Sequence, residues 1–127
     1  MEIFGIGIDV VEIARIDRAI EAHQDRFLKK IFTSQEREYC KDRRSSALHF
    51  AARFAAKEAA AKALKTGIGG DAGWLDLEVI NGPSGAPEIR LHGNAAAFAK
   101  RHGITQILVS LSHSKDYAAA NALAICQ

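Results

Sequence analysis

An alanine-rich segment in the middle of the chain, residues 46–66 (SALHFAARFAAKEAAAKALKT), constrains the fold more than any other feature. Alanine is the strongest helix former. Ser45 or Ser46 is a suitable N-cap residue at the start of a helix, and Gly67 is a suitable residue for its end. We therefore expect one long helix. Its alanines lie on nearly every side, whereas a surface helix has one apolar and one polar face. This pattern predicts a helix that neighbouring elements pack closely from all sides.

The remaining elements follow from periodicity and turn residues. Residues 2–11 are β-branched and apolar on both faces, which predicts a short central strand. Thr33 to Glu36 form a capping-box sequence at the start of a helix that reaches about Lys41. We expect further helices at 12–22, 24–31 and 94–102, and strands at 74–80, 87–92, 104–112 and 117–125. The prediction is a single α+β domain, residues 1–127, with helices mostly in its first half and antiparallel strands in its second.

Length and composition fit one ordinary globular domain. The chain has 127 residues, of which 48% are hydrophobic and 25% charged, with a net charge of +2. It is too short to need a second core, and its composition is not that of a disordered chain. No apolar run approaches the ~20 residues that cross a bilayer, and the first residues lack the basic region of a leader. Two distant cysteines without a CxxC pair argue against a zinc site or a disulfide framework and favour a cytoplasmic location.

Asp9 is an acidic residue in a strand that is otherwise apolar. Period-two alternation places it on one face with Ile3, Gly5, Gly7 and Val11. The glycines leave that face open to close approach, and a carboxylate there is costly unless it is paired or bound to a metal. Asp9 also begins the sequence DVVE, which resembles a capping box for the next helix. A helix cap and a metal ligand therefore both remain open for this residue.

Glu58 is the second acidic residue in an unexpected place. At ~100° per residue it lies on the same stripe of the long helix as Phe54, on the side that Phe50 and Phe54 mark as buried. A surface pair with Lys62, four residues later, is the alternative reading and is a common, weak feature. The alanines that surround Glu58 favour a packed position.

Two carboxylates from different elements suit a hard divalent cation. Mg²⁺ takes oxygen ligands, keeps several waters and often obtains its other ligands from substrate phosphates. The long helix also carries four basic residues that could hold such phosphates: Arg53, Lys57, Lys62 and Lys65. Metal, carboxylates and cations around an anionic substrate are typical of phosphoryl transfer.

These residues lie in motifs that resemble those of the holo-[acyl-carrier-protein] synthase family, the small bacterial 4′-phosphopantetheinyl transferases. The first motif is matched by residues 5–13 (GIGIDVVEI) and the second by residues 53–63 (RFAAKEAAAKA). A third region is matched by residues 74–79, followed by Gly85-Ala86-Pro87. The resemblance covers essentially the whole chain, and the order and spacing of the motifs agree.

The resemblance implies a Mg²⁺-dependent reaction of fatty acid biosynthesis. The 4′-phosphopantetheine group of coenzyme A moves to a serine hydroxyl of apo acyl carrier protein, and adenosine 3′,5′-bisphosphate is released. It also implies a homotrimer with active sites between subunits. The expected catalytic residues are Asp9, Glu58 and Lys62, with Asp9 and Glu58 as metal ligands. The expected coenzyme contacts are Arg53, Lys62, Gly85, Pro87 and His113. Whether Glu58 takes the serine proton directly or through a metal-bound water stays open.

A basic segment points to a partner. Residues 26–44 contain seven basic and three acidic side chains. Arg15, Arg18 and Arg26 are expected near one another on the helix 12–22 and its continuation. Such a surface suits an acidic protein, and carrier proteins of this class are acidic. A solvated basic face without a partner is the alternative for this segment. For the chain as a whole, the alternative to the enzyme is a non-catalytic basic oligomer that binds nucleotides or RNA. Few aromatic residues interrupt the basic segment, so we expect no nucleic acid partner, and no membrane partner.

Overall fold

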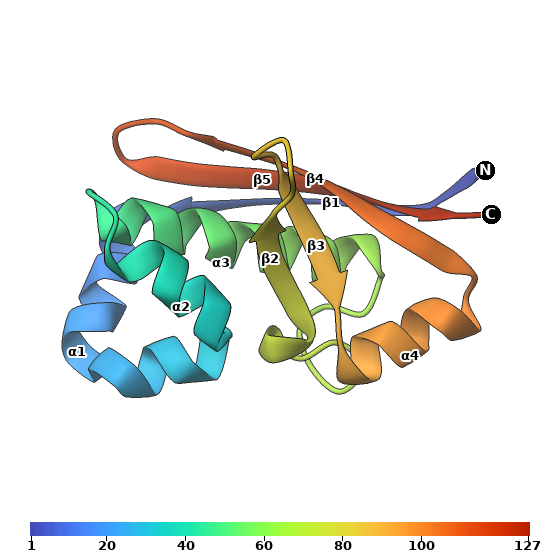
Figure 1. The fold of residues 1–127 in the computed structure, drawn as a ribbon, viewed down its shortest axis with the longest axis horizontal. Coiled ribbons are helices and arrows are strands. Elements are labelled where there is room, and N and C mark those ends of the chain that lie inside the picture. The colour runs from blue at the N-terminus through green and yellow to red at the C-terminus, as the bar shows by residue number, and fades with distance from the viewer.

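A three-stranded antiparallel sheet packed on one long helix is the centre of the fold (Figure 1). The computed structural model describes all 127 residues. The sheet contains β1 (Glu2–Glu12), β5 (Tyr117–Cys126) and β4 (Ile104–His113), in the spatial order β1-β5-β4. Helix α3 (Ser46–Ala63) lies across one face of all three strands. The predicted α+β class is confirmed.

Helix α3 is buried over most of its length, as its alanines predict. Every residue from Phe50 to Lys57 is buried, and so are four alanines of the last two turns. Two glycines of β1 allow the helix to lie directly on the strand. A Cβ atom at Gly5 would collide with the carbonyl of Ala63, and one at Gly7 would collide with the carbonyl of Ala59. The contact places the centre of β1 against the second half of α3.

A bulge near the start of β1 changes one prediction. The pairing of β1 with β5 shifts between Ile3 and Gly5, so the alternation of side chains is interrupted there. Ile3 is 62% exposed, and the expectation that it shares the face of Asp9 is wrong. Phe4 packs against the core in its place.

Helices α1 (Ile13–Ile31) and α2 (Ser34–Lys41) lie beside α3 at one end of the molecule (Figure 1). Helix α1 bends at Gln24, whose backbone is not helical (φ 46, ψ −126), so the predicted break between two helical segments is confirmed. The capping box at the start of α2 is also confirmed. The hydroxyl of Thr33 accepts from the Glu36 amide at 3.2 Å, and the Glu36 carboxylate accepts from the Thr33 amide at 2.8 Å.

A hairpin and a short helix complete the fold. Strands β2 (Leu77–Asn81) and β3 (Pro87–Leu91) form a separate two-stranded sheet, and α4 (Gly93–Arg101) leads into β4. The predicted strand at 74–80 is wrong for its first three residues, which form the 3₁₀ helix η1 (Trp74–Asp76). The Asp76 carboxylate accepts from the Gly73 amide at 3.2 Å and closes this turn.

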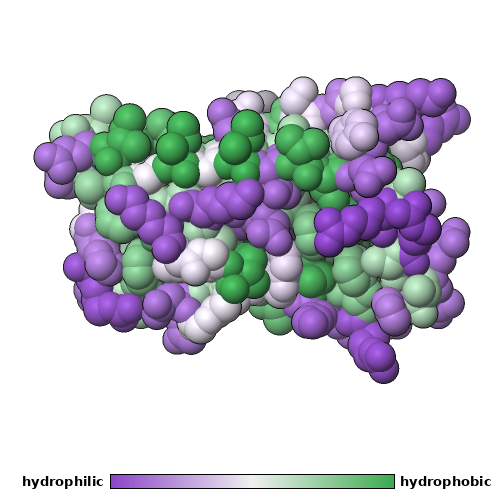
Figure 2. Space-filling view, turned by 180° about the vertical axis from the view of Figure 1, so that it is seen from behind, coloured by the Kyte–Doolittle hydropathy of each residue, from purple (hydrophilic) through white to green (hydrophobic).

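The outer face of the main sheet carries exposed apolar side chains. Ile6, Ile8 and Val10 of β1 are 68%, 65% and 58% exposed, and Leu108 and Tyr117 are about half exposed. Figure 1 shows no helix on this face, and Figure 2 shows a row of hydrophobic residues along the side of the molecule that the sheet occupies. None of the helices combines the length and apolar composition needed to cross a bilayer.

Candidate active site

Asp9 faces helix α3 and is paired with a lysine. Lys62 Nζ lies 3.4 Å from Asp9 Oδ1 and donates to the Ile8 carbonyl at 2.9 Å. The Asp9 side chain is 18% exposed and that of Lys62 is 50% exposed. Helix α1 begins only at Ile13, and its N-cap residue Glu12 makes no side-chain cap bond. The structure therefore does not support the helix-cap reading of Asp9.

Glu58 lies one helical turn before Lys62 and shares the surroundings of Asp9. Burial raises the pKa of the Glu58 carboxyl, and the negative charge of Asp9 raises it further, while the positive charges of Lys62 and Arg15 oppose the change. Gly7, two residues before Asp9, packs on the carbonyl of Ala59, the residue after Glu58, which brings the two carboxylates into the same region. Lys62 pairs with Asp9 and not with Glu58, so the surface Glu58–Lys62 pair is not formed.

The chemistry of this carboxylate pair fits a hard divalent cation. Asp9 and Glu58 offer oxygen ligands, and the ammonium group bound between Asp9 and the Ile8 carbonyl shows that the position accepts positive charge. No group of three or more acidic, histidine or cysteine side chains forms a closed metal cage. Few protein ligands are typical of Mg²⁺ sites that keep waters and bind substrate phosphates.

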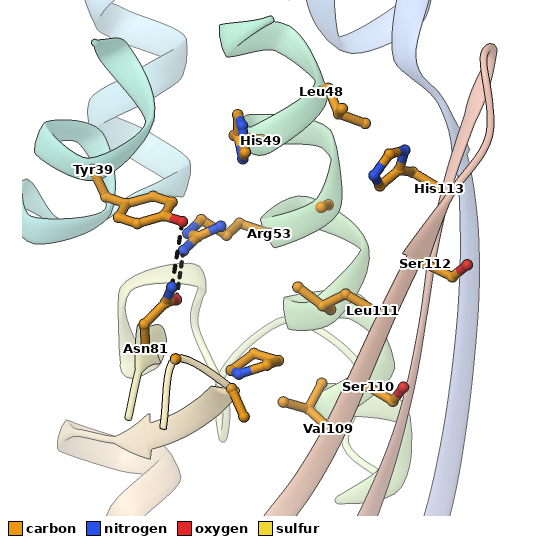
Figure 3. Close-up of a pocket in the computed structure, with 14 residues that line it drawn as sticks. Tyr39, Leu48, His49, Arg53, Asn81, Val109, Ser110, Leu111, Ser112 and His113 are labelled. Atoms are coloured by element: carbon orange, nitrogen blue, oxygen red, sulfur yellow. Dashed lines mark hydrogen bonds between the residues drawn. The ribbon is translucent and has the colours of Figure 1, made fainter. Parts of the chain in front are cut away.

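A pocket of about 440 Å³ lies at the β4 edge of the sheet (Figure 3). Its walls come from α2, α3, the β2–β3 hairpin and β4. Four of the five residues predicted to contact the coenzyme line it: Arg53, Gly85, Pro87 and His113. The structure thus brings together residues that lie up to 60 positions apart, and no acidic side chain joins them.

Five further polar or aromatic residues line this pocket and have no counterpart in the sequence analysis: Tyr39, His49, Asn81, Ser110 and Ser112. Burial lowers the pKa of His49, and the nearby positive charges of Arg53, Arg43 and His113 lower it further. Tyr39 and Asn81 come from separate elements with no shared motif, so no sequence pattern identifies them. His49 precedes Arg53 by one helical turn, which is the one spacing that could have suggested it.

The carboxylate pair and the pocket do not meet within one chain. Asp9 is on β1 and His113 is on β4, and β5 lies between these two strands. None of Asp9, Glu58 and Lys62 lines the pocket. One chain therefore presents two separate halves of the predicted site, at opposite edges of its sheet.

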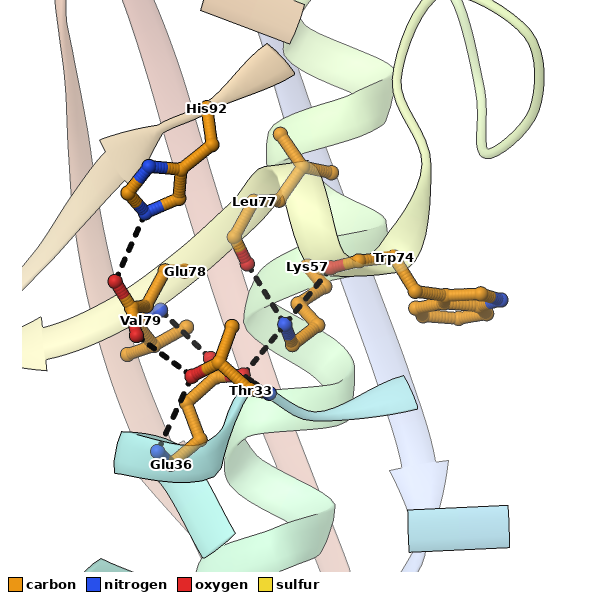
Figure 4. A network of polar contacts seen from close by, with 8 residues as sticks. All are labelled: Thr33, Glu36, Lys57, Trp74, Leu77, Glu78, Val79 and His92. Atoms are coloured by element: carbon orange, nitrogen blue, oxygen red, sulfur yellow. Dashed lines mark hydrogen bonds and ion pairs between the residues drawn. The ribbon is translucent and has the colours of Figure 1, made fainter. Parts of the chain in front are cut away.

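Lys57 does not take part in either half, and the expectation that it holds phosphates is wrong. Its side chain is fully buried, and Nζ contacts Glu36 at 2.7 Å and the carbonyls of Trp74 and Leu77 at 2.9 and 2.8 Å (Figure 4). Burial lowers the pKa of Lys57 even though Glu36 acts in the other direction. The residue joins α3 to α2 and β2, which is a structural role.

Lys65 also points elsewhere. Its Nζ lies 4.7 Å from the centre of the Phe4 ring, a cation–π contact near the start of β1. Of the four basic residues predicted for the long helix, Lys65 lies beyond its end, Lys62 is at the carboxylate pair and Arg53 is in the pocket.

Comparison with known proteins shows the family to which this chain belongs. The sequence model described as "4'-phosphopantetheinyl transferase superfamily" matches residues 5–122, and the chain belongs to that superfamily. A relative from Desulforudis audaxviator is 50% identical over 123 residues, which cover 97% of this chain and 93% of the relative. That relative is a holo-[acyl-carrier-protein] synthase.

Solved structures give the same result. The holo-[acyl-carrier-protein] synthase of Neisseria meningitidis superposes with a TM-score of 0.91 at 31% identity, over 98% of this chain and 99% of that one. The enzyme of the same name from Helicobacter pylori, in complex with coenzyme A, gives a TM-score of 0.84 at 33% identity, over 94% of this chain and 99% of that one. The sequence resemblance to the holo-[acyl-carrier-protein] synthase family is therefore confirmed.

Proposed function

We propose that this chain is a holo-[acyl-carrier-protein] synthase that transfers the 4′-phosphopantetheine group of coenzyme A to a serine of apo acyl carrier protein. The observation that carries the proposal is the carboxylate pair of Asp9 and Glu58, with Lys62 bound to Asp9, at the contact of β1 and α3. The relatives named above support the same activity.

The residues of the pair can perform this reaction. The serine oxygen forms a bond to the pantetheine-side phosphorus of the pyrophosphate, and the bond from that phosphorus to the bridging oxygen breaks. Asp9 and Glu58 would hold Mg²⁺, which when bound neutralises charge on the pyrophosphate oxygens. Lys62 contributes a second positive charge for the departing nucleotide phosphate. A carboxylate at this position can also receive the serine proton, and Glu58 is the proposed acceptor.

The site is completed by a second copy of the chain in a homotrimer. The pocket with Arg53 and His113 lies at the opposite edge of the sheet from Asp9, so a coenzyme that contacts both halves must lie between copies. The exposed apolar face of the sheet, with Ile6, Ile8 and Val10, offers a surface for such assembly.

The acidic carrier protein docks on the first segment of α1. The Arg15 guanidinium lies 6.0 Å from the centre of the Phe54 ring, and its charge acts on Glu58, so this helix lies beside the carboxylate pair. The bend at Gln24 puts Arg26 on a different segment from Arg15 and Arg18. Charge reversal at Arg15 and Arg18 should raise the KM for the carrier more than the KM for coenzyme A; an equal rise in both would argue against docking here.

The proposal is tested by mass spectrometry of the carrier. Incubation with coenzyme A, Mg²⁺ and an apo carrier protein should add the mass of one phosphopantetheine group. A chelator should stop the reaction, and Asp9→Asn or Glu58→Gln should slow it by at least ~100-fold, because each removes a metal ligand worth several kcal/mol in the transition state. An unmodified carrier, beside an active control enzyme, would favour the nucleotide- or RNA-binding alternative.

A further inference from the structure

Arg53 is a buried cation without a carboxylate partner. The residue is 4% exposed, yet none of the ion pairs in the molecule includes it. Buried charges are normally paired or bound to a ligand, because an unpaired charge loses hydration without compensation. Arg53 lines the pocket, and the pocket contains no acidic residue. The chain itself therefore supplies no anionic partner for this guanidinium.

Two side chains fix the guanidinium in place. Arg53 Nη2 donates to Asn81 Oδ1 at 3.0 Å, and Asn81 Nδ2 donates to the Tyr39 hydroxyl at 3.3 Å (Figure 3). The guanidinium carbon of Arg53 also lies 4.1 Å from the centre of the Tyr39 ring. The three residues come from α3, β2 and α2 and form a closed cycle of contacts, so the guanidinium has little freedom to rotate.

The position of Arg53 lowers the stability of the fold, because one of its buried nitrogens has no hydrogen-bond partner. Arg53 Nε is the one buried side-chain nitrogen or oxygen in the molecule without a hydrogen-bond partner. Native proteins leave few such atoms, because each one carries the full desolvation penalty. Arg53 lines the pocket, and its contacts with Asn81 and Tyr39 leave this nitrogen without a partner.

We propose that Asn81 and Tyr39 are positioning residues that hold Arg53 for an anionic group of the ligand. The inference rests on the proposed function, because the ligand is taken to be the nucleotide part of coenzyme A. Neither residue needs to touch the ligand, since both act through Arg53. A guanidinium that is already fixed loses less conformational entropy when it binds an anion, which strengthens binding.

The test measures nucleotide binding and steady-state kinetics of Asn81→Ala and Tyr39→Phe. Adenosine 3′,5′-bisphosphate is the probe in calorimetry. Asn81→Ala should weaken its binding and raise the KM for coenzyme A about tenfold, the effect of losing a hydrogen bond to a charged group. Tyr39→Phe keeps the ring and should weaken binding only about threefold. The KM for the carrier should not change.

A double-mutant cycle with Arg53→Lys separates positioning from a general effect on the fold. Once the guanidinium is absent, Asn81→Ala should have no further effect on nucleotide binding. The matched control is Asn94→Ala, which removes an amide that donates to the Gly70 carbonyl at 3.1 Å, outside the pocket, and it should bind like the unaltered chain.

The outcomes distinguish this inference from the proposed function. If the unaltered chain neither binds the nucleotide nor modifies the carrier, the proposed function itself fails. If the unaltered chain does both, but Asn81→Ala behaves like Asn94→Ala, the positioning role is overturned. Effects of Asn81→Ala and Arg53→Lys that simply add would overturn it as well.

Discussion

At the scale of single residues, Lys62 binds the carboxylate of Asp9 that we propose as a metal ligand. Its ammonium group is bound to Asp9 and to the Ile8 carbonyl, so in the ligand-free chain the lysine competes with a divalent cation for the same carboxylate. If the pyrophosphate binds as proposed, it would give the lysine a new anionic partner and Asp9 would be released. Metal and coenzyme are therefore expected to favour each other's binding.

Lys62→Met tests this competition. The variant should bind Mn²⁺, a spectroscopic substitute for Mg²⁺, about two- to fivefold more tightly in the absence of nucleotide, which corresponds to the ~0.4–1 kcal/mol of an exposed ion pair. Turnover should fall at the same time, because the phosphate loses its cation. Electron paramagnetic resonance measures free Mn²⁺ directly. Lys65→Met is the matched control, since it removes the same charge at the Phe4 contact; equal Mn²⁺ affinities for the two variants would contradict the competition.

Glu78 gives a second prediction at this scale, for the dependence of stability on pH. Burial acts to raise its pKa, but hydrogen bonds from Thr33 (2.6 Å) and His92 (2.9 Å) and the charges of His92 and Arg90 outweigh burial and lower the pKa below its ordinary 4.5. The ionised form therefore stabilises the fold above about pH 4.5, and this contribution is lost as the pH falls through the lowered value.

Urea unfolding of Glu78→Gln between pH 5.5 and 3 measures this contribution. The free energy of unfolding should be lower for the variant at pH 5.5, and its difference from the unaltered chain should shrink as the pH falls. Glu21→Gln, at an exposed position of α1, is the control and should show no such trend. A difference that stays constant over this range would argue that the Glu78 charge does not contribute.

At the scale of elements, the contact of β1 with α3 decides whether the carboxylate pair forms. Gly7→Ala places a methyl group against the Ala59 carbonyl, and a backbone atom cannot move without moving the helix. The variant should lose about 1–3 kcal/mol in urea unfolding, as overpacked cores do, and it should also bind Mn²⁺ more weakly. Gly70→Ala meets open space and no backbone strain and should change neither quantity. Unchanged Mn²⁺ binding in Gly7→Ala would show that the carboxylate pair does not depend on the contact of β1 with α3.

Most element boundaries could be predicted because their signals are local. The capping box at Thr33, the alanines of α3 and the polar turn before Tyr117 each depend on a few neighbouring residues. The 3₁₀ helix at Trp74 differed from the predicted strand, because the Asp76 carboxylate closes a local turn in place of strand pairing. The role of Lys57 also could not be predicted, since its partners Glu36 and Leu77 lie about twenty positions away on either side.

At the scale of the whole molecule, the residue patterns predict members of a site but do not by themselves predict their separation into two halves. Asp9, Glu58 and Lys62 lie together because β1 contacts α3, and Arg53, Gly85, Pro87 and His113 lie together around the pocket. The distance between the halves depends on the strand order β1-β5-β4. Pairing of the first strand with the last is a long-range feature that no local pattern encodes.

If an active site is shared between copies, two inactive variants should restore activity when they are assembled together. Asp9→Asn disables one half of the site, and the double change Arg53→Met and His113→Ala disables the other. In trimers that form at random from equal amounts of the two variants, each shared site takes Asp9 from one copy and the pocket from its neighbour. The site is intact when the first copy has an unaltered Asp9 and the neighbour has an unaltered pocket. Each condition is met half of the time, so about one quarter of normal activity should return.

Carrier modification is measured after the two variants are coexpressed, with each variant alone as the control. A mixture that stays as inactive as its components would place the complete site within one chain. Ile8→Glu, introduced into both variants, charges the exposed apolar face of the sheet and should abolish the recovery, because it prevents assembly while it leaves Asp9 and the pocket residues in place. Sedimentation velocity on the same samples should show smaller particles whenever the recovery is lost, which links the restored activity to contact between copies.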